Sequence, residues 1–514
     1  MSRLEAAKSA EVVSLDRPFS NFLFAEQRFQ GSFPIRRLFS QARSHTCRTL
    51  VVEDVPATGV VDDENQEILR LWPDYKSKGV KRLSFWKTPF TSIEHVRGLS
   101  DADCFGYALL KRDICPSRNC DRWSIFEAVV SKYDHHHNYI PCAKPFMFRC
   151  GRLDFKVNGV LYCQQNCLNK ACAQVALRSA CATYLNDPDL SYSKINSLAF
   201  TADDDFTPWD GLNTPQVPRV LNGLNIPFFD FDYEANPSLR DPFPYQRILY
   251  SGVESGSGAL VAFKMSGPGA GNVAHMIPVF GHTFNEDTWA PNAEGDYFNI
   301  GNAIRYVPSD SWMNSFVVHD DNYGSDLCIP KAFLRRENAD YAVALLPRDF
   351  AYNGLFAEFA ASDYFYSLLP KLAGVANPWL KRLVQYCVKQ KLILRAVPIS
   401  KTAYIDHLSH IRDWELHCEN SETLDHLGTI EPDRMWMIEV SIPDLFSTNL
   451  RKIGEVLLDA TRPFSAKVDF TLFVLARFPE IYFFFEKMNS DGTPSFVTVP
   501  SDFLSHTKLL RSGD

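Results

Sequence analysis

The spacing of apolar positions divides the chain into a leader and three larger parts. Residues 46–155 show the short alternation of β-strands, as at 48–55, and are broken by Pro, Asp and Asn. Residues 156–347 begin with helical spacing and continue with strand-like runs. Residues 348–514 follow the same order. Helices followed by runs of strands are typical of the α+β class, which is the fold class we predict.

The first 45 residues carry a weaker pattern, with one short amphipathic stretch at 35–42. We therefore expect 1–45 to be a loosely ordered leader and 46–155 a β-rich N-terminal domain. A central domain is expected over 156–347 and a C-terminal domain of helices and strands over 348–514. No internal repeat and no low-complexity tract interrupts this plan.

A helix that begins near Cys172 is the first candidate for chemistry. Its apolar face repeats at helical spacing through Ala173, Ala176, Leu177, Ala180 and Tyr184. Asn169 is expected to cap this helix. Unpaired N–H groups and the positive end of the helix dipole favour a thiolate at Cys172, and the small neighbours Ala171 and Ala173 let a carbonyl approach.

The neighbouring cysteines have simpler interpretations. Cysteine is among the most buried residue types, so a packing role is the alternative for Cys172 itself. Cys163 and Cys181 are expected in the core, and Cys167 lies in a loop without a helix start behind it. Upstream, Gln164 or Gln165 can supply a side-chain N–H to an oxyanion hole, with the Cys172 backbone N–H as the second donor.

A thiolate nucleophile needs a base, and the base needs an orienting partner. A glycine-rich segment at 266–272 is expected to be a mobile loop before a strand that opens with His275, whereas His282 at its far end should point away. A later strand closes with Asp320 and Asp321 before a turn, and an acid there can hold an imidazole tautomer. A core histidine and an acidic turn are the alternative interpretations.

Taken together, these motifs resemble the papain-like cysteine peptidases of the bacteriocin-leader-processing type. The likeness rests on a glutamine followed by "CAQVAL", on "HMIPVFG", on "VHDDNYG" and on "GLNTPQVPRVLNGLNI", and it covers residues 156–347. It implies a papain-like central domain, with N-terminal helices packed on an antiparallel sheet. It also implies Cys172 as nucleophile, His275 as base, Asp320 as orienting acid and Gln165 (or Gln164) as oxyanion donor.

The chain departs from that family at several positions. The family usually has Cys-Gly-Pro-Ala where this chain has "CAQV", and Asp-Pro where it has Asp320-Asp321. The glutamine also lies slightly farther ahead of Cys172 than usual. The flanking parts, 46–155 and 348–514, are outside the family core and are expected to bind or regulate something, including a protein partner.

Composition narrows the functional class. The 514 residues are 46% hydrophobic and 22% charged, and the net charge of −8 gives no reason to expect nucleic-acid binding. No apolar run reaches the ~20 residues of a membrane span. The N-terminus lacks a secretory signal, and thirteen cysteines without one favour reduced thiols in the cytoplasm. We therefore expect an intracellular protein without a membrane or nucleic-acid partner.

A metal site is the rival use of the cysteines. The loose spacings of Cys163, Cys167 and Cys172, and of Cys115 and Cys120, fall near zinc-ligand spacing, and His135–His137 lie close in sequence to the second group. Adjacent histidines cannot all face one ion, so we expect no metal and no cofactor.

The sequence therefore predicts a cysteine hydrolase that cleaves a peptide or isopeptide bond through a thioester. The alternatives are a deamidase or acyltransferase with the same triad, and an inactive papain-like scaffold that binds a protein.

Overall fold

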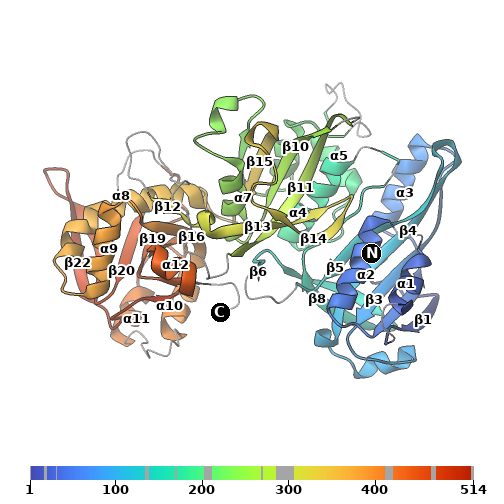
Figure 1. The fold of residues 1–514 in the computed structure, drawn as a ribbon, viewed down its shortest axis with the longest axis horizontal. Helices are drawn as coiled ribbons and strands as arrows, with labels where there is room; N and C mark the ends of the chain where they lie inside the picture. The colour runs from blue at the N-terminus through green and yellow to red at the C-terminus, as the bar shows by residue number, and fades with distance from the viewer. Residues whose placement is uncertain are drawn as a thin grey trace. The chain divides into compact units, whose positions relative to one another are not determined.

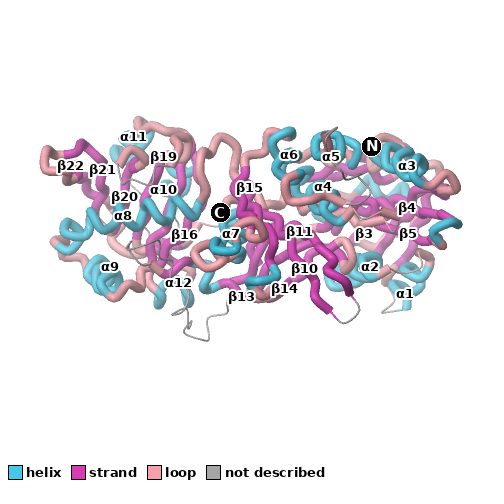
Figure 2. The backbone as a smooth tube through the Cα atoms, turned by 90° about the horizontal axis from the view of Figure 1, so that it is seen from above, coloured by secondary structure: helices cyan, strands magenta, loops and turns pink. Residues whose placement is uncertain are grey.

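The structure, a computed structural model, has an α+β fold with several antiparallel sheets (Figures 1 and 2). It describes residues 2–16, 20–29, 32–132, 138–166, 168–169, 171–201, 211–267, 270–284, 306–410, 421–464 and 470–510. The α+β prediction is confirmed at this level.

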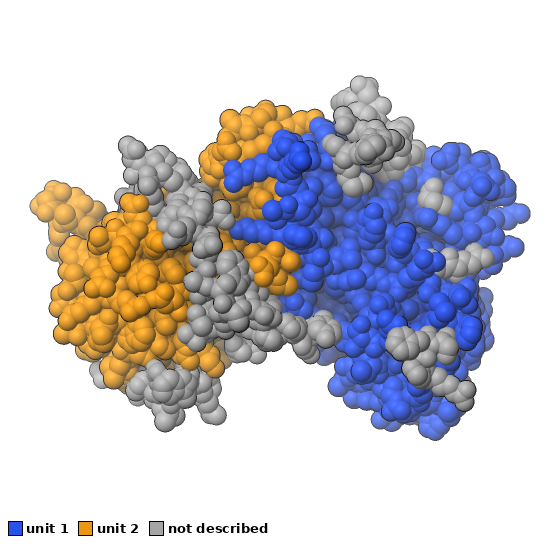
Figure 3. All heavy atoms as spheres, in the orientation of Figure 1, with its two compact units in different colours: residues 1–226, 258–281, 316–342 blue, residues 227–257, 282–315, 343–514 orange. Residues whose placement is uncertain are grey.

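The chain forms two compact units, coloured separately in Figure 3. Unit 1 comprises residues 1–226, 258–281 and 316–342, and unit 2 comprises 227–257, 282–315 and 343–514. The β-rich region at 46–155 therefore shares a unit with the cysteine helix. Parts of the expected central domain belong to each unit, because the chain leaves unit 1 after residue 226 and returns twice.

The first half of unit 1 is built on an antiparallel sheet of five strands in sequential order. These strands are β1 (Ser9–Ser14), β2 (Thr49–Val55), β3 (Lys76–Trp86), β4 (Cys104–Cys115) and β5 (Cys120–Val130). The accompanying helices are α1 (Ser20–Gln27), α2 (Phe33–Ser44) and α3 (Val60–Leu71), and a hairpin of β7 (Lys144–Cys150) and β8 (Leu153–Gly159) follows. Alternate residues of the strands, such as Leu83, Phe85 and Leu110, pack in one core with Leu38 and Phe39 of α2.

The leader prediction for residues 1–45 is wrong where the structure describes them. β1 pairs in register with β2 along its whole length, and Ile35 and Leu38 of α2 are fully buried. Arg82 also donates to the backbone carbonyl oxygens of Arg3 and Glu5, at 2.9 and 3.0 Å. The amphipathic stretch at 35–42 therefore completes the core of the sheet.

The second half of unit 1 carries the cysteine helix. Its helices are α4 (Cys172–Leu185), α5 (Tyr192–Ala199) and α6 (Gln216–Gly223). Its strands are β6 (Asn138–Tyr139), β10 (Ala259–Gly267), β11 (Ala270–Phe284), β13 (Met313–Asp320), β14 (Gly324–Pro330) and β15 (Ala339–Leu345). The sheet runs in the order β14-β13-β11-β10-β15, with β6 paired to β11, and α4 packs against β10.

Unit 2 is a seven-stranded sheet with helices from its own chain segments. The sheet order is β12 (Val307–Pro308), β16 (Ile393–Ser400), β17 (Arg434–Ser441), β19 (Gly454–Asp459), β20 (Phe473–Phe478), β21 (Ile481–Met488) and β22 (Pro494–Pro500). The helices are α7 (Tyr245–Glu254), α8 (Gly354–Ala373), α9 (Pro378–Val388), α10 (Lys401–His410), α11 (Ser421–Gly428) and α12 (Pro443–Asn449). β18 (Arg451–Lys452) pairs with β23 (Thr507–Lys508), and β9 (Phe228–Asp232) is the neighbour of β15, whose last residues belong to this unit.

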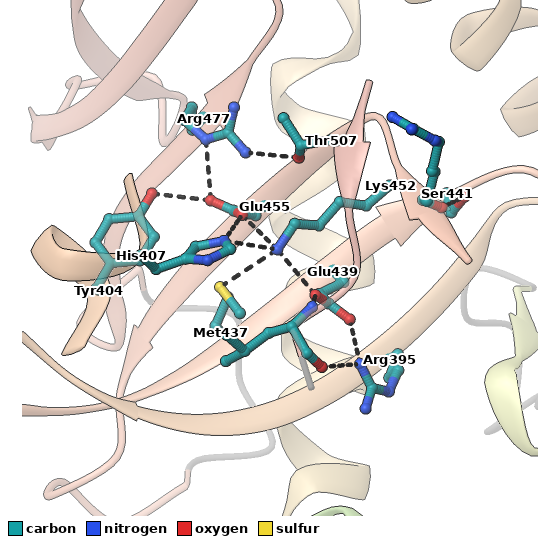
Figure 4. A network of polar contacts seen from close by, with 12 residues as sticks. Arg395, Tyr404, His407, Met437, Glu439, Ser441, Lys452, Glu455, Arg477 and Thr507 are labelled. Carbon is teal, nitrogen blue, oxygen red and sulfur yellow. Dashed lines mark hydrogen bonds and ion pairs between the residues drawn. The ribbon is translucent and has the colours of Figure 1, made fainter. Parts of the chain in front are cut away.

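A row of buried charges crosses the sheet of unit 2 (Figure 4). Arg395, Glu439, Glu455 and Arg477 are register partners on four successive strands, so their side chains share one face. At the two ends of the row, Arg395 lies 2.7 Å from Glu439 and Arg477 lies 3.0 Å from Glu455. Between them, Lys452 lies 2.8 Å from Glu439 and 2.6 Å from Glu455. The lysine therefore offsets two like charges that would otherwise face each other across neighbouring strands.

Replacement of Lys452 by Met should leave two buried carboxylates without their shared cation. We expect a loss of roughly 3–5 kcal/mol in the free energy of unfolding, measured by urea denaturation. The exposed Lys381 of α9 provides the control, because Lys381→Met removes a solvated charge. A loss as small for Lys452→Met as for this control would show that the row does not stabilise the unit.

A close approach of strands in unit 1 fixes Gly281. A Cβ there would lie 2.9 Å from both Ile140 Cγ1 and the Tyr139 carbonyl oxygen, and 3.2 Å from Val317 Cβ. We expect Gly281→Ala to destabilise the protein by roughly 1–3 kcal/mol in urea denaturation, whereas Gly98→Ala, where a Cβ meets nothing within 4 Å, is nearly neutral. Equal stability of the two variants would contradict this packing.

Candidate active site

Three distant segments of unit 1 bring the expected triad together. Cys172 is the first residue of α4, His275 lies in β11, and Asp320 is the last residue of β13. β11 is the sheet neighbour of both β10, which α4 contacts, and β13. Because β11 lies between β10 and β13, the imidazole of His275 lies between the start of α4 and the end of β13.

His275 is the centre of this cluster. It pairs with Phe263 across the β10–β11 hairpin, and the two rings meet edge to face with centroids 5.5 Å apart. Nε2 lies 3.2 Å from Asp320 Oδ2, and the side chain of Cys172 is close enough to the ring to raise its pKa. Because Nε2 faces the carboxylate, Nδ1 is the ring nitrogen left for the thiol.

His275 does not open its strand, which differs from the sequence prediction. β11 begins at Ala270, which pairs with Gly267 of β10. Residues 268–269 of the glycine-rich segment lie outside the described residues. Residues 270–274, expected to lie before the strand, are therefore part of β11.

Cys172 is half-exposed, whereas His275 is buried at 6% exposure. The thiol lies 3.9 Å from the carbonyl oxygen of Ala274, the residue before the imidazole. Ala171 occupies the N-cap position and supplies no side-chain bond to the first turn. The expected cap by Asn169 is wrong, because the helix begins two residues later than a cap at that position requires. The free N–H groups of the first turn are left beside the thiol.

The backbone of the turn after β13 orients Asp320. Its Oδ1 accepts the backbone N–H groups of Asn322 and Tyr323, at 2.8 and 3.1 Å. Its Oδ2 remains for His275. The buried hydroxyl of Tyr162 donates to the backbone carbonyl oxygen of Asp320 at 3.3 Å. The carboxylate therefore has one oxygen fixed by the turn and one by the imidazole.

A second carboxylate stands beside the first. Asp321 Oδ1 lies 3.5 Å from His275 Nε2 and accepts a 2.9 Å bond from the Asn322 amide. Its Oδ2 is buried without a hydrogen-bond partner among the described residues. The sequence marked this position as a departure from the family, and the consecutive aspartates were the signal that both acids would reach the imidazole.

The charges of this cluster shift one another's pKa values. Burial alone would lower the pKa of His275, but the bonds to Asp320 and Cys172 and the charge of Asp321 raise it to about 10. Burial raises the pKa of Asp320, yet its bond to His275 and the turn N–H groups bring it below the ordinary value. Burial raises the pKa of Asp321 to about 6, against the opposing charge of His275. The imidazole is thus held as a cation at neutral pH.

The two glutamines make other contacts. Gln165 Nε2 donates to the carbonyl oxygen of Asn169 at 3.0 Å, within its own loop. Gln164 accepts from the Ile125 backbone N–H at 2.9 Å and lies 3.5 Å from Ser32 Oγ. Over the described residues, neither side chain bonds Cys172 or His275. The structure therefore does not bring the expected oxyanion donor to the thiol.

The other cysteines and histidines have structural contacts. Cys163 is buried and accepts from Arg178 at 2.8 Å, and Cys181 is fully buried, as expected for core residues. His282 is seven positions from His275, so it faces the other side of the sheet, where it contacts Glu254 at 2.9 Å. Cys167 and the histidines at 135–137 lie outside the described residues.

A zinc site at Cys115 and Cys120 would need a histidine close to both thiols. Cys115 and Cys120 are register partners in the β4–β5 hairpin, and no histidine joins them among the described residues. Among all described residues, the cluster that could hold an ion is formed by His275, Asp320 and Asp321. Their ligand atoms lie within 4.8 Å of one another. A metal there would take the Nε2 atom that now bonds Asp320, so a metal and the triad are mutually exclusive uses of this nitrogen.

Comparison with protein-family models, with curated proteins and with solved structures found no match to this chain. Within the described residues, no helix is long and apolar enough to cross a membrane.

The raised pKa of His275 can be measured directly. We expect NMR titration of its ring protons to show an imidazolium up to about pH 10, and Asp320→Asn to lower this pKa because a charge-assisted bond is lost. A histidine with a raised pKa stabilises the fold fully below its unfolded pKa, and this stability disappears as the pH rises through about 10. An unchanged titration in Asp320→Asn would show that this carboxylate does not hold the ring.

Proposed function

We propose that the protein is a cysteine hydrolase with a papain-like central fold that cleaves a peptide or isopeptide bond. The observation that carries the proposal is the imidazole of His275, whose Nε2 lies 3.2 Å from Asp320 Oδ2 and whose pKa is raised by the nearby Cys172 side chain at the start of α4. A nucleophile, a base and an orienting acid in this order are the parts that acyl transfer through a cysteine needs. The packing of α4 on the antiparallel sheet supports the papain-like arrangement.

The chemistry follows from the positions of the three groups. At neutral pH His275 already carries the proton of the cysteine–histidine pair, and the Cys172 sulfur attacks a substrate carbonyl carbon as a thiolate to form a tetrahedral oxyanion. The His275 imidazolium then protonates the leaving amine as the C–N bond breaks, which leaves a thioester. Water attacks the thioester and gives a proton to His275, and the C–S bond breaks to release the acid and restore the thiolate beside the imidazolium. Asp320 keeps Nε2 engaged throughout, so that Nδ1 stays directed at the sulfur.

Stabilisation of the oxyanion is assigned to the start of α4. The backbone N–H of Cys172 belongs to a helix turn without a side-chain cap, and such N–H groups are directed out of the helix end. Gln165 would have to release the Asn169 carbonyl to act as the second donor. Removal of Gln165 should therefore cost less than the ~100-fold or more that a committed oxyanion donor contributes.

A second candidate, an inactive scaffold that binds a protein, is favoured by the engagement of both glutamines elsewhere. Deamidation and acyl transfer use the same triad with another leaving group or acceptor. The free thiols of the described cysteines support the proposed intracellular location.

A thiol-directed electrophile tests the proposal. We expect iodoacetamide to label the folded protein at Cys172, and Cys172→Ala to abolish both that label and hydrolysis of a proteome-derived peptide pool. The exposed Cys328 is the matched control, and Cys328→Ala should leave hydrolysis unchanged. Reactive labelling at Cys167 in place of Cys172 would contradict the assignment, and labelling at Cys172 without any hydrolysis would favour the scaffold.

A further inference from the structure

A polar pocket of about 650 Å³ adjoins the triad within unit 1. Residues from four segments line it, among them Phe33, Arg122, Gln165, Asn169 and Asp321. Asp321 joins the pocket to the triad, since its carboxyl also lies 3.5 Å from His275 Nε2. Asn169 precedes the nucleophile by only three residues, which limits the distance between their Cα atoms to about 11 Å. A ligand in the pocket is therefore within a few peptide residues of the thiol.

Arg122 lines this pocket, and no carboxylate of the described residues pairs with it. It is half-buried on β5, and its guanidinium donates to the backbone carbonyl oxygen of Gln165 at 3.2 Å. That neutral acceptor fixes the planar group without neutralising it. Arg36, the other arginine of the lining, is paired with Glu26 at 3.2 Å and is mostly exposed. Arg122 thus offers a fixed positive charge with free N–H donors.

The remaining lining complements a peptide. Asn169 Oδ1 is a buried acceptor without a partner among the described residues, so it can accept a peptide N–H. Phe33 stands at the edge with 66% exposure, and its ring lies 6.3 Å from that of Tyr323, which is 58% exposed. The Asp321 carboxyl is engaged by His275 and Asn322, so its charge is offset on the side of the triad.

We propose that this pocket is the substrate-recognition subsite of the hydrolase and that Arg122 binds a carboxylate of a peptide substrate there. The carboxylate is an acidic side chain or a free C-terminus, and a guanidinium recognises both through the same paired N–H donors. This inference rests on the proposed function, because it assigns the pocket to the substrate of Cys172. It makes the enzyme selective for peptides that carry negative charge within about three residues of the cleaved bond.

Binding to the Cys172→Ala protein tests the subsite without turnover. Three fluorescein-labelled hexapeptide mixtures are compared by fluorescence anisotropy: one with a fixed Glu and an amidated C-terminus, one with Gln in its place, and one with Gln and a free C-terminus. We expect the Glu mixture, the free-acid mixture or both to bind about tenfold more tightly than the amidated Gln mixture. The mixture that shows the gain identifies the source of the carboxylate.

Variants of Arg122 provide the decisive comparison. Arg122→Gln should reduce the preference to less than about twofold, Arg122→Lys should retain part of it, and Arg149→Gln, on a surface pair with Asp154, should leave it intact. Circular dichroism verifies that each variant is folded. Equal affinities in the parent, binding of no mixture, or a preference that survives Arg122→Gln would overturn the subsite. Labelling of Cys172 reports on the hydrolase separately, so the two failures are distinguishable.

Discussion

The bond between the His275 imidazole and the Asp320 carboxylate is the contact on which the site depends. One oxygen of Asp320 is fixed by two N–H groups of the turn that ends β13, so the other can hold Nε2 in a single direction. The ring's second nitrogen is then left free of this carboxylate, and the side chain of Cys172 at the start of α4 lies near the ring. Sheet order, turn geometry and helix start each contribute one part, and none of them positions the imidazole alone.

Buried charge serves two different purposes in the two units. In unit 2, Arg395, Glu439, Lys452, Glu455 and Arg477 are almost fully buried and face partners of opposite charge, which makes the row a structural element of the sheet. In unit 1, the His275 cluster includes a half-exposed thiol, and Asp321 keeps an oxygen without a partner among the described residues. A charged cluster with a partly exposed thiol is typical of a site for chemistry, whereas charges that are almost fully buried against opposite charges are typical of a core.

Two members of the triad could be predicted because each marks a boundary between elements: Cys172 begins a helix, and Asp320 ends a strand, whereas His275 lies inside β11. Period-2 alternation likewise predicted most strands of the described sheets. The buried Arg82 of β3 pairs with Glu53. Because charged residues occupy such core positions, β3 could not be predicted from the spacing of hydrophobic residues. The contact between Gln165 and Asn169 lies in an irregular loop. Such a loop has no helical or strand periodicity from which the direction of a side chain could be predicted. The sequence pattern predicted only residues 35–42 of the helix at 33–44, because only five of its twelve residues are buried.

The most direct measurement uses two cysteines of one molecule. The iodoacetamide alkylation rates of Cys172 and the exposed Cys328 are determined together by mass spectrometry at neutral pH, in the parent and in His275→Ala. If the imidazole activates the thiol, Cys172 reacts on the order of a hundredfold faster than Cys328, and this advantage is lost with the histidine. Equal rates in the parent protein, or an advantage that persists without the imidazole, would contradict the hydrolase.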